Sequence, residues 1–133
     1  MDNQLFLGLR TALYHVDDLA KAKEWYSRVL VTEPYFDEPF YVGFKVGGFE
    51  LGLDPDVSKL RPGTGGAVAY WGVQDARAAF QRLLELGASE LEAPQEVGGG
   101  IQVATVLDPF GNVLGIIENP HFKIEGPVPP LTP

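Results

Sequence analysis

The stretch LGLRTALYHVDDLAKAKEWYSRVL, residues 7–30, decides the fold because its periodicity changes in the middle. Apolar and β-favouring residues predict a strand over Leu5–Val16. Asp17 and Asp18 offer a side-chain cap for the exposed amides of a helix start. Beyond them apolar residues recur every three or four positions, which is typical of an amphipathic helix. A strand that runs directly into a helix is therefore expected here.

Two further strands, Phe40–Val46 and Phe49–Leu53, are predicted after this helix. Gly47-Gly48 between them can supply the positive φ angles of a tight hairpin. The next thirteen residues are rich in proline and glycine, and they indicate a connection rather than another element.

The same order then returns. Ala67–Val73 predicts a strand, Asp75 a second helix cap, and Gly87 the end of the second helix. Strands are predicted at Ile101–Leu107 and Val113–Ile117, joined by a turn.

Two register shifts support an internal duplication. A shift of 57 residues aligns the start of the two modules, with Val16 on Val73 and Asp18 on Asp75. A shift of 65 residues aligns their last strands, with Leu51 on Ile116. The chain is therefore predicted to be one α+β domain over 1–133. Its parts are a first module at 5–55, a linker at 56–66, a second module at 67–120 and a proline-rich C-terminal arm at 121–133.

Composition excludes several classes of protein. The 133 residues include no cysteine, so thiolate metal sites and disulfides are impossible, and a cytoplasmic location is expected. The formal charge of -8, without a Lys/Arg cluster, argues against nucleic-acid binding. The apolar runs are too short to span a membrane.

Each predicted sheet has one face for its helix and a second face that needs another partner. Two copies can curve these second faces around a common cleft. Such a junction is a usual place for a small-molecule ligand.

Two sequence pieces within this duplicated frame carry a family resemblance. The first is Val16–Leu19 running into Trp25-Tyr26, and the second is the turn Asp108–Asn112 followed by a strand that ends at Glu118-Asn119-Pro120. In this order they resemble the vicinal oxygen chelate superfamily, which includes glyoxalase I, bleomycin-resistance proteins and extradiol dioxygenases. The resemblance implies two βαβββ modules in a curved mixed sheet around a cleft. It also implies a homodimer, with modules paired within one chain or across two.

The resemblance further implies four metal-ligand positions, which fall on Thr11, Glu50, Val68 and Gly115. Only Glu50 is a good ligand, whereas catalytic zinc or iron sites need about three protein ligands. His15 lies about 13 Å along the strand from Thr11 at roughly 3.3 Å per residue, too far to substitute. No metal and no cofactor are therefore expected.

Strand alternation assigns other side chains to the same cleft. We expect a mostly apolar ligand site with one carboxylate, which is either structural, ligand-binding or a general base with a pKa raised by burial. The predicted ligand-binding residues are Thr11, Leu13, Glu50, Gly52, Val68, Tyr70, Gly115 and Ile117, and Glu50 is the single catalytic candidate.

Three functions fit these observations. The first is a metal-free, homodimeric small-molecule-binding protein of the glyoxalase/bleomycin-resistance type, which sequesters a drug-like or cationic compound. The second is a metal-dependent glyoxalase-type lyase or isomerase, or an extradiol-type dioxygenase. The third is an interaction or regulatory module. Three of the four implied metal-ligand positions hold residues that are poor ligands or have no donor atom, and this favours the metal-free binding protein.

Overall fold

A computed structural model describes residue 5 and residues 9–122, and it confirms the duplicated α+β fold. Each half contains the order strand, helix and three strands. The elements are β1 (Thr11–His15), α1 (Leu19–Leu30), β2 (Phe36–Glu38), β3 (Tyr41–Val46), β4 (Phe49–Asp54), β5 (Ala69–Gly72), α2 (Ala76–Glu85), β6 (Ser89–Glu96), β7 (Gln102–Leu107) and β8 (Val113–Glu118). None of the helices in this described part is long and apolar enough to cross a membrane.

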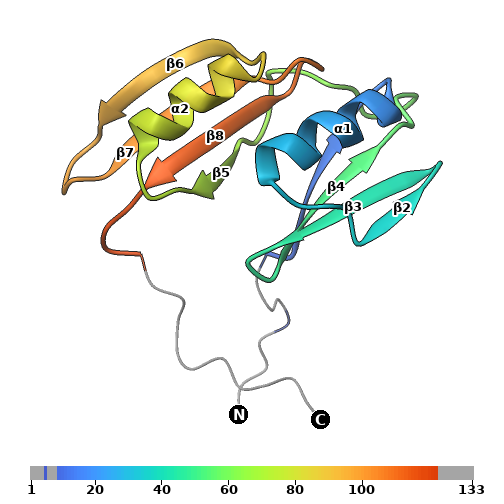
Figure 1. Cartoon of the computed structure of the whole chain (residues 1–133), viewed down its shortest axis with the longest axis horizontal. Helices are drawn as coiled ribbons and strands as arrows, with labels where there is room; N and C mark the ends of the chain where they lie inside the picture. Colours follow the sequence, from blue (N-terminus) through green and yellow to red (C-terminus); the bar gives the residue numbers. More distant parts are fainter. Residues whose placement is uncertain (1–4, 6–8, 123–133) are drawn as a thin grey trace.

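The strands form two separate four-stranded sheets, with the orders β1-β4-β3-β2 and β5-β8-β7-β6. In each, the first strand of the module pairs in parallel with the last, and the other pairs are antiparallel. Figure 1 shows the two sheets beside each other, with the linker passing between them. The second half thus repeats the topology of the first.

Both helices begin as the sequence predicts. The carboxylates of Asp18 and Asp75 accept hydrogen bonds from the backbone amides of Lys21 and Ala78, at 3.1 and 3.0 Å. Each bond satisfies one of the amides that a helix start leaves without an internal partner. α2 ends before Gly87, whose φ of 110° is a conformation that favours glycine.

The helix-covered faces of both sheets share one hydrophobic core. Trp25 and Tyr26 of α1 and Phe80 of α2 are buried in it. The Trp25 indole donates to the backbone oxygen of Leu86 at 2.9 Å, and the Tyr26 hydroxyl donates to Asp108 at 2.5 Å. Side chains of α1 therefore bind the second half through both packing and hydrogen bonds.

Three strands differ from the sequence prediction. β1 begins at Thr11 rather than Leu5, because its partner β4 begins only at Phe49 and Thr11 pairs with Glu50. Leu9, before this pairing starts, is exposed. β2 and β6 have no apolar alternation to reveal them, since both are edge strands whose side chains are almost all exposed. The boundaries of the modules and linker stay predictions, and the arm lies outside the described residues beyond 122.

Strand pairing corrects one of the two repeat registers. The amides of Val16 and Val73 donate to the carbonyl oxygens of Asp54 and Ile117 respectively, which makes these two carbonyl positions equivalent. The shift between the last strands is therefore 63 residues, not 65. Gly115 corresponds to Gly52, and Glu50 to Val113. Sequence similarity alone favoured 65 because both registers preserve the alternation of apolar residues.

Candidate functional site

The predicted site residues of the first half lie together on the sheet face opposite α1. Ala12 and Tyr14 of β1 pack toward the core, whereas Leu13 is 43% exposed on the other side. Thr11 pairs with Glu50 and Leu13 with Gly52 across β1 and β4. We call this surface, defined by Thr11, Leu13, Glu50 and Gly52, the first-half face.

The Glu50 carboxylate is the centre of a hydroxyl cluster on this face. One of its oxygens accepts from the Thr11 hydroxyl at 2.8 Å, and the other accepts from the Tyr35 hydroxyl at 2.5 Å. The Tyr41 ring lies on the same face, since Tyr41 and Gly43 alternate with the buried Val42 along β3. Two hydroxyls thus fix the orientation of both carboxylate oxygens.

This cluster reverses the expected pKa shift of Glu50. The hydrogen bond from Tyr35 lowers the pKa of Glu50, and the bond from Thr11, the nearby Tyr41 hydroxyl and the Lys45 charge act in the same direction against a partial burial effect. The predicted increase was wrong because stabilisation of the charged form by hydrogen bonds exceeds the burial penalty. Glu50 is therefore an anion at neutral pH, and a weak general base.

Two glycines leave space for the cluster. Gly43 and Gly52 are partners on β3 and β4, and both are buried. A Cβ atom at Gly43 would lie 2.8 Å from Glu50 Oε2, and one at Gly52 would overlap the hydroxyl of Tyr41. Because these two positions have no side chain, the Glu50 carboxylate and the Tyr41 ring can lie directly on the backbone. We call the two glycines the floor of the first-half face, and Gly115 under the Tyr70 ring the floor of the second-half face.

The second half has a corresponding face, defined by Val68, Tyr70, Gly115 and Ile117. Tyr70 is 47% exposed, and its ring lies on Gly115, where an added Cβ would meet Tyr70 Cδ1 at 2.7 Å. Thr105 pairs with Gly115 and donates to Glu92 at 2.9 Å. Thr105 of β7 therefore lies on this second-half face.

The two faces do not enclose a cleft within one chain. The helix-covered sides of the two sheets meet in the common core, so the two faces point away from that core. In the described residues the two sheets stay separate and do not form one curved sheet around a cleft. The eight predicted ligand-binding residues are therefore divided into two groups of four, one on each half. The structure brings together the members of each group, but not the two groups.

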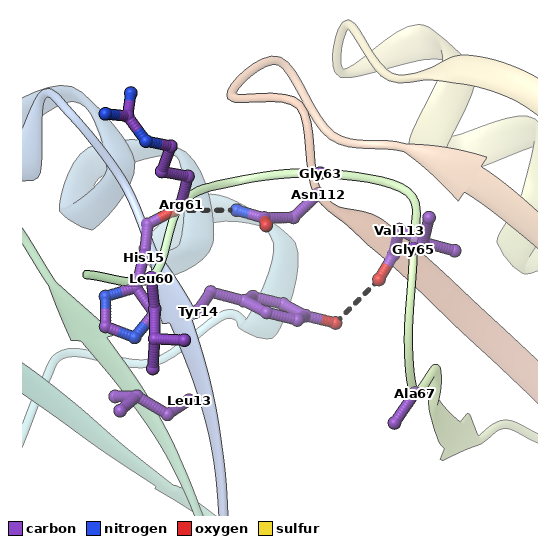
Figure 2. Close-up of a pocket in the computed structure, with 10 residues that line it drawn as sticks. All are labelled: Leu13, Tyr14, His15, Leu60, Arg61, Gly63, Gly65, Ala67, Asn112 and Val113. Atoms are coloured by element: carbon purple, nitrogen blue, oxygen red, sulfur yellow. Dashed lines mark hydrogen bonds between the residues drawn. The ribbon is translucent and has the colours of Figure 1, made fainter. Parts of the chain in front are cut away.

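A cavity of about 280 Å³ lies elsewhere, between the end of β1, the linker and the start of β8 (Figure 2). The Tyr14 hydroxyl donates to the backbone oxygen of Val113 at 2.9 Å, and the Asn112 amide donates to that of His15 at 3.1 Å. Leu13 is the single predicted site residue in its wall. These contacts connect the two halves beside the first-half face.

The donor set does not fit the metal site that the resemblance implies. In the corrected register Glu50 is equivalent to Val113 and Gly115 to Gly52, so with either last-strand pair the four positions include at most one carboxylate. The rings of Tyr41 and Tyr70 cover the two glycines. Residue 5 and residues 9–122 contain no group of three or more His, Asp or Glu side chains placed to hold a metal ion. His15 and His121 lie within 2.9 and 2.8 Å of the backbone oxygens of Asp56 and Gly99, which suits structural roles.

Sequence reasoning missed Tyr35, Tyr41 and Lys45. Tyr35 precedes an edge strand that has no alternation, and its contact with Glu50 depends on how that strand folds back. Tyr41 could have been found, because it has the same parity as Lys45, which pairs directly with Glu50.

Comparisons with known proteins agree with this architecture. The family model of the Glyoxalase/Bleomycin resistance protein/Dioxygenase superfamily matches residues 8–116. A glyoxalase-related enzyme from Fulvimarina pelagi is 20% identical with a TM-score of 0.74, covering 90% of this chain and 93% of that one. A lactoylglutathione lyase from Agrobacterium tumefaciens is 21% identical with a TM-score of 0.67, covering 84% and 93%. These identities show a shared fold alone. A search of curated proteins gives no match.

Proposed function

Because the chain belongs to the Glyoxalase/Bleomycin resistance protein/Dioxygenase superfamily, we propose that it is a metal-free protein that binds a small, partly apolar, drug-like molecule. The observation that carries this proposal is the tyrosine ring over each of Gly52 and Gly115. In the second half the ring stands at Gly115, where the family resemblance implies a carboxylate ligand, and in the first half it stands at the equivalent residue Gly52.

We also propose that the ligand site is completed in a homodimer. Leu13, Val68 and Tyr70 are 43%, 36% and 47% exposed, although all three are large apolar or aromatic side chains. Pairing the first-half face of one copy with the second-half face of another would cover them and produce two equivalent clefts. A closed two-fold arrangement of this kind is the commonest oligomer.

Sedimentation equilibrium tests this pairing. The expected mass is twice the 14.5 kDa of the chain. Leu13→Asp and Tyr70→Asp should each give monomers, because each would bury an unpaired charge in the interface. Mixing these two variants should restore some dimer, since one of the two clefts then has wild-type faces. Val31→Asp is the control, at an exposed residue after α1. A monomeric wild-type protein, or no restoration, contradicts cross-chain pairing.

Thermal shift with a panel of drug-like compounds tests binding. A ligand at 100 times its Kd stabilises the folded state by about 2.7 kcal/mol, which raises Tm by several degrees. Glu50→Gln should reduce the shift for compounds with a donor group. If no compound changes Tm and Glu50→Gln has no effect on any ligand, the binding proposal fails.

The metal-dependent lyase or dioxygenase makes the opposite prediction. Purified protein would then contain stoichiometric divalent metal, and manganese, iron, nickel or zinc would raise its Tm. Elemental analysis decides between the two functions. We expect no metal, because a thiol-free chain with Thr, Val and Gly at three of the four implied positions and a single carboxylate, Glu50, at the fourth has too few donors. One metal ion per site would overturn the proposal.

A further inference from the structure

We propose that the first-half face recognises an organic ammonium group, held against Glu50 and the rings of Tyr35 and Tyr41. This inference rests on the proposed ligand-binding function, and it names the chemical class of the ligand. The ammonium would carry alkyl substituents, so that it contacts both a carboxylate and an aromatic surface.

The first reason is the charge state of the carboxylate. Both oxygens of Glu50 accept hydrogen bonds from neutral hydroxyls, which orient the charge without neutralising it. The same bonds lower the pKa of Glu50, so the anion persists at neutral pH. The Tyr35 hydroxyl uses its hydrogen on Glu50, which leaves its oxygen as an acceptor. The anionic oxygen of Glu50 and the acceptor oxygen of Tyr35 therefore lie next to each other.

The second reason is that a cation already occupies this surface. The ammonium nitrogen of Lys45 lies 5.0 Å from the centroid of the Tyr35 ring, inside the range of a cation–π interaction. Lys45 pairs with Glu50 across β3 and β4, so both side chains extend from the same face. The Lys45 side chain is exposed, whereas the Glu50 carboxylate is held by its two hydroxyl partners. Lys45 is thus an internal stand-in that a ligand cation can displace.

The third reason is the aromatic border of the same face. Phe36 lies between Phe40 and Tyr41, with ring centroids 6.0 Å from each. Phe36 pairs with Gly43 and is 37% exposed, while Phe40 is 65% exposed. These rings provide apolar contact for the alkyl substituents of an ammonium group, next to its counter-charge.

The second-half face lacks this combination. Its exposed tyrosine, Tyr70, lies on Gly115, and its carboxylate, Glu92, accepts from the hydroxyl of Thr105. No ring contact or cation–π pair of the described residues involves Tyr70. The proposal therefore assigns the ammonium to the first half alone.

The test compares choline with its neutral isostere 3,3-dimethyl-1-butanol by titration followed with NMR. We expect choline to bind at least about tenfold more tightly than the alcohol, because the two differ in charge and not in shape. The Lys45 side-chain resonances should shift as its nitrogen leaves the Tyr35 ring. Equal affinity for the two compounds would overturn the proposal.

Variants locate the site. Glu50→Gln keeps an acceptor but removes the charge, and it should weaken choline binding about tenfold. Tyr35→Leu removes the ring and should weaken it similarly, whereas Lys45→Met should tighten it about threefold by removing the internal competitor. Glu85→Gln, which removes one exposed charge on α2, is the matched control and should change nothing. Circular dichroism verifies that each variant is folded.

The outcomes separate this inference from the proposed function. If neutral panel compounds bind and the chain dimerises, but choline affinity does not respond to Glu50→Gln, the ammonium assignment fails and the binding function stands. If no dimer forms and no panel compound binds, yet choline binds with the expected variant effects, the cleft proposal fails. Weaker choline binding in Glu50→Gln but not in Glu85→Gln, which changes the net charge equally, distinguishes a local site from general attraction to an acidic chain.

Discussion

The first-half face and the second-half face have the same frame but different chemistry. Across the four strands of each sheet, equivalent rows read Leu13–Gly52–Gly43–Phe36 and Tyr70–Gly115–Thr105–Glu92. Both rows have a glycine on the last strand of the module with a tyrosine ring over it. In the first half a second glycine follows, and the added space holds the Glu50 carboxylate. The duplication therefore conserves backbone geometry, while single side chains decide where charge collects.

The largest expected effect comes from separating the halves that support these faces. Trp25→Ala should lower the free energy of unfolding by about 3–5 kcal/mol, because it removes a buried ring and the hydrogen bond to Leu86. Urea denaturation measures this change. Phe122→Ala, at a residue 69% exposed, is the control and should change stability by less than about 0.5 kcal/mol. Equal effects would mean that Trp25 does not join the halves.

A pair of glycine substitutions compares the two floors directly. Gly52→Ala should lower the free energy of unfolding by about 1–3 kcal/mol, because the new methyl group overlaps Tyr41 and approaches Leu13 to 2.9 Å. Gly115→Ala should cost less, since the half-exposed Tyr70 ring can move, although the Ala69 oxygen lies at 3.0 Å. Denaturation of both variants gives the order. The reverse order would show that the second-half floor is the tighter one.

The two helix ends provide a smaller test of the same comparison. α1 ends at Leu30 and is capped by Val31, whose φ of 53° is a left-handed conformation that is strained for a β-branched residue. The other helix, α2, is followed closely by Gly87. Val31→Gly should raise the free energy of unfolding by about 1 kcal/mol, and Gly87→Ala should lower it by a similar amount. Thermal unfolding checks both signs. A Val31→Gly variant less stable than wild type would show that this residue is not strained.

The smallest expected effect concerns pH. The folded-state pKa of Glu50 is below its unfolded value, so its contribution to stability is present above about pH 4.3 and is lost as pH falls through the folded pKa. The stability difference between wild type and Glu50→Gln should therefore shrink on acidification. Chemical denaturation between about pH 6 and pH 3 measures it. Because this carboxylate is partly exposed, solvent screening keeps the effect small. A difference that grows toward acid would contradict the pKa direction.

The sequence was sufficient for much of the fold because its signals are local. Asp18 and Asp75 cap helices through bonds that span three residues, and Gly47-Gly48 closes a hairpin between adjacent strands. The edge strands β2 and β6 escaped detection because exposed strands need no apolar alternation.

In the candidate site, local sequence patterns predict which side chains share a face but not how they interact. Alternation placed Thr11, Leu13, Glu50 and Gly52 on one face, since side-chain direction follows from the strand itself. It could not determine the pKa of Glu50, because the controlling hydroxyl belongs to Tyr35 beyond the helix.

By itself the sequence determined two modules, their helix caps and the parity of their strands, all of which depend on neighbouring residues. Only the tertiary structure decided the register that makes Gly52 equivalent to Gly115, because a slip of two residues leaves the alternation unchanged. It also decided that the halves meet through their helix-side core and leave their two faces apart. That choice depends on long-range contacts such as Trp25 with Leu86 and Tyr26 with Asp108, which have no local periodicity.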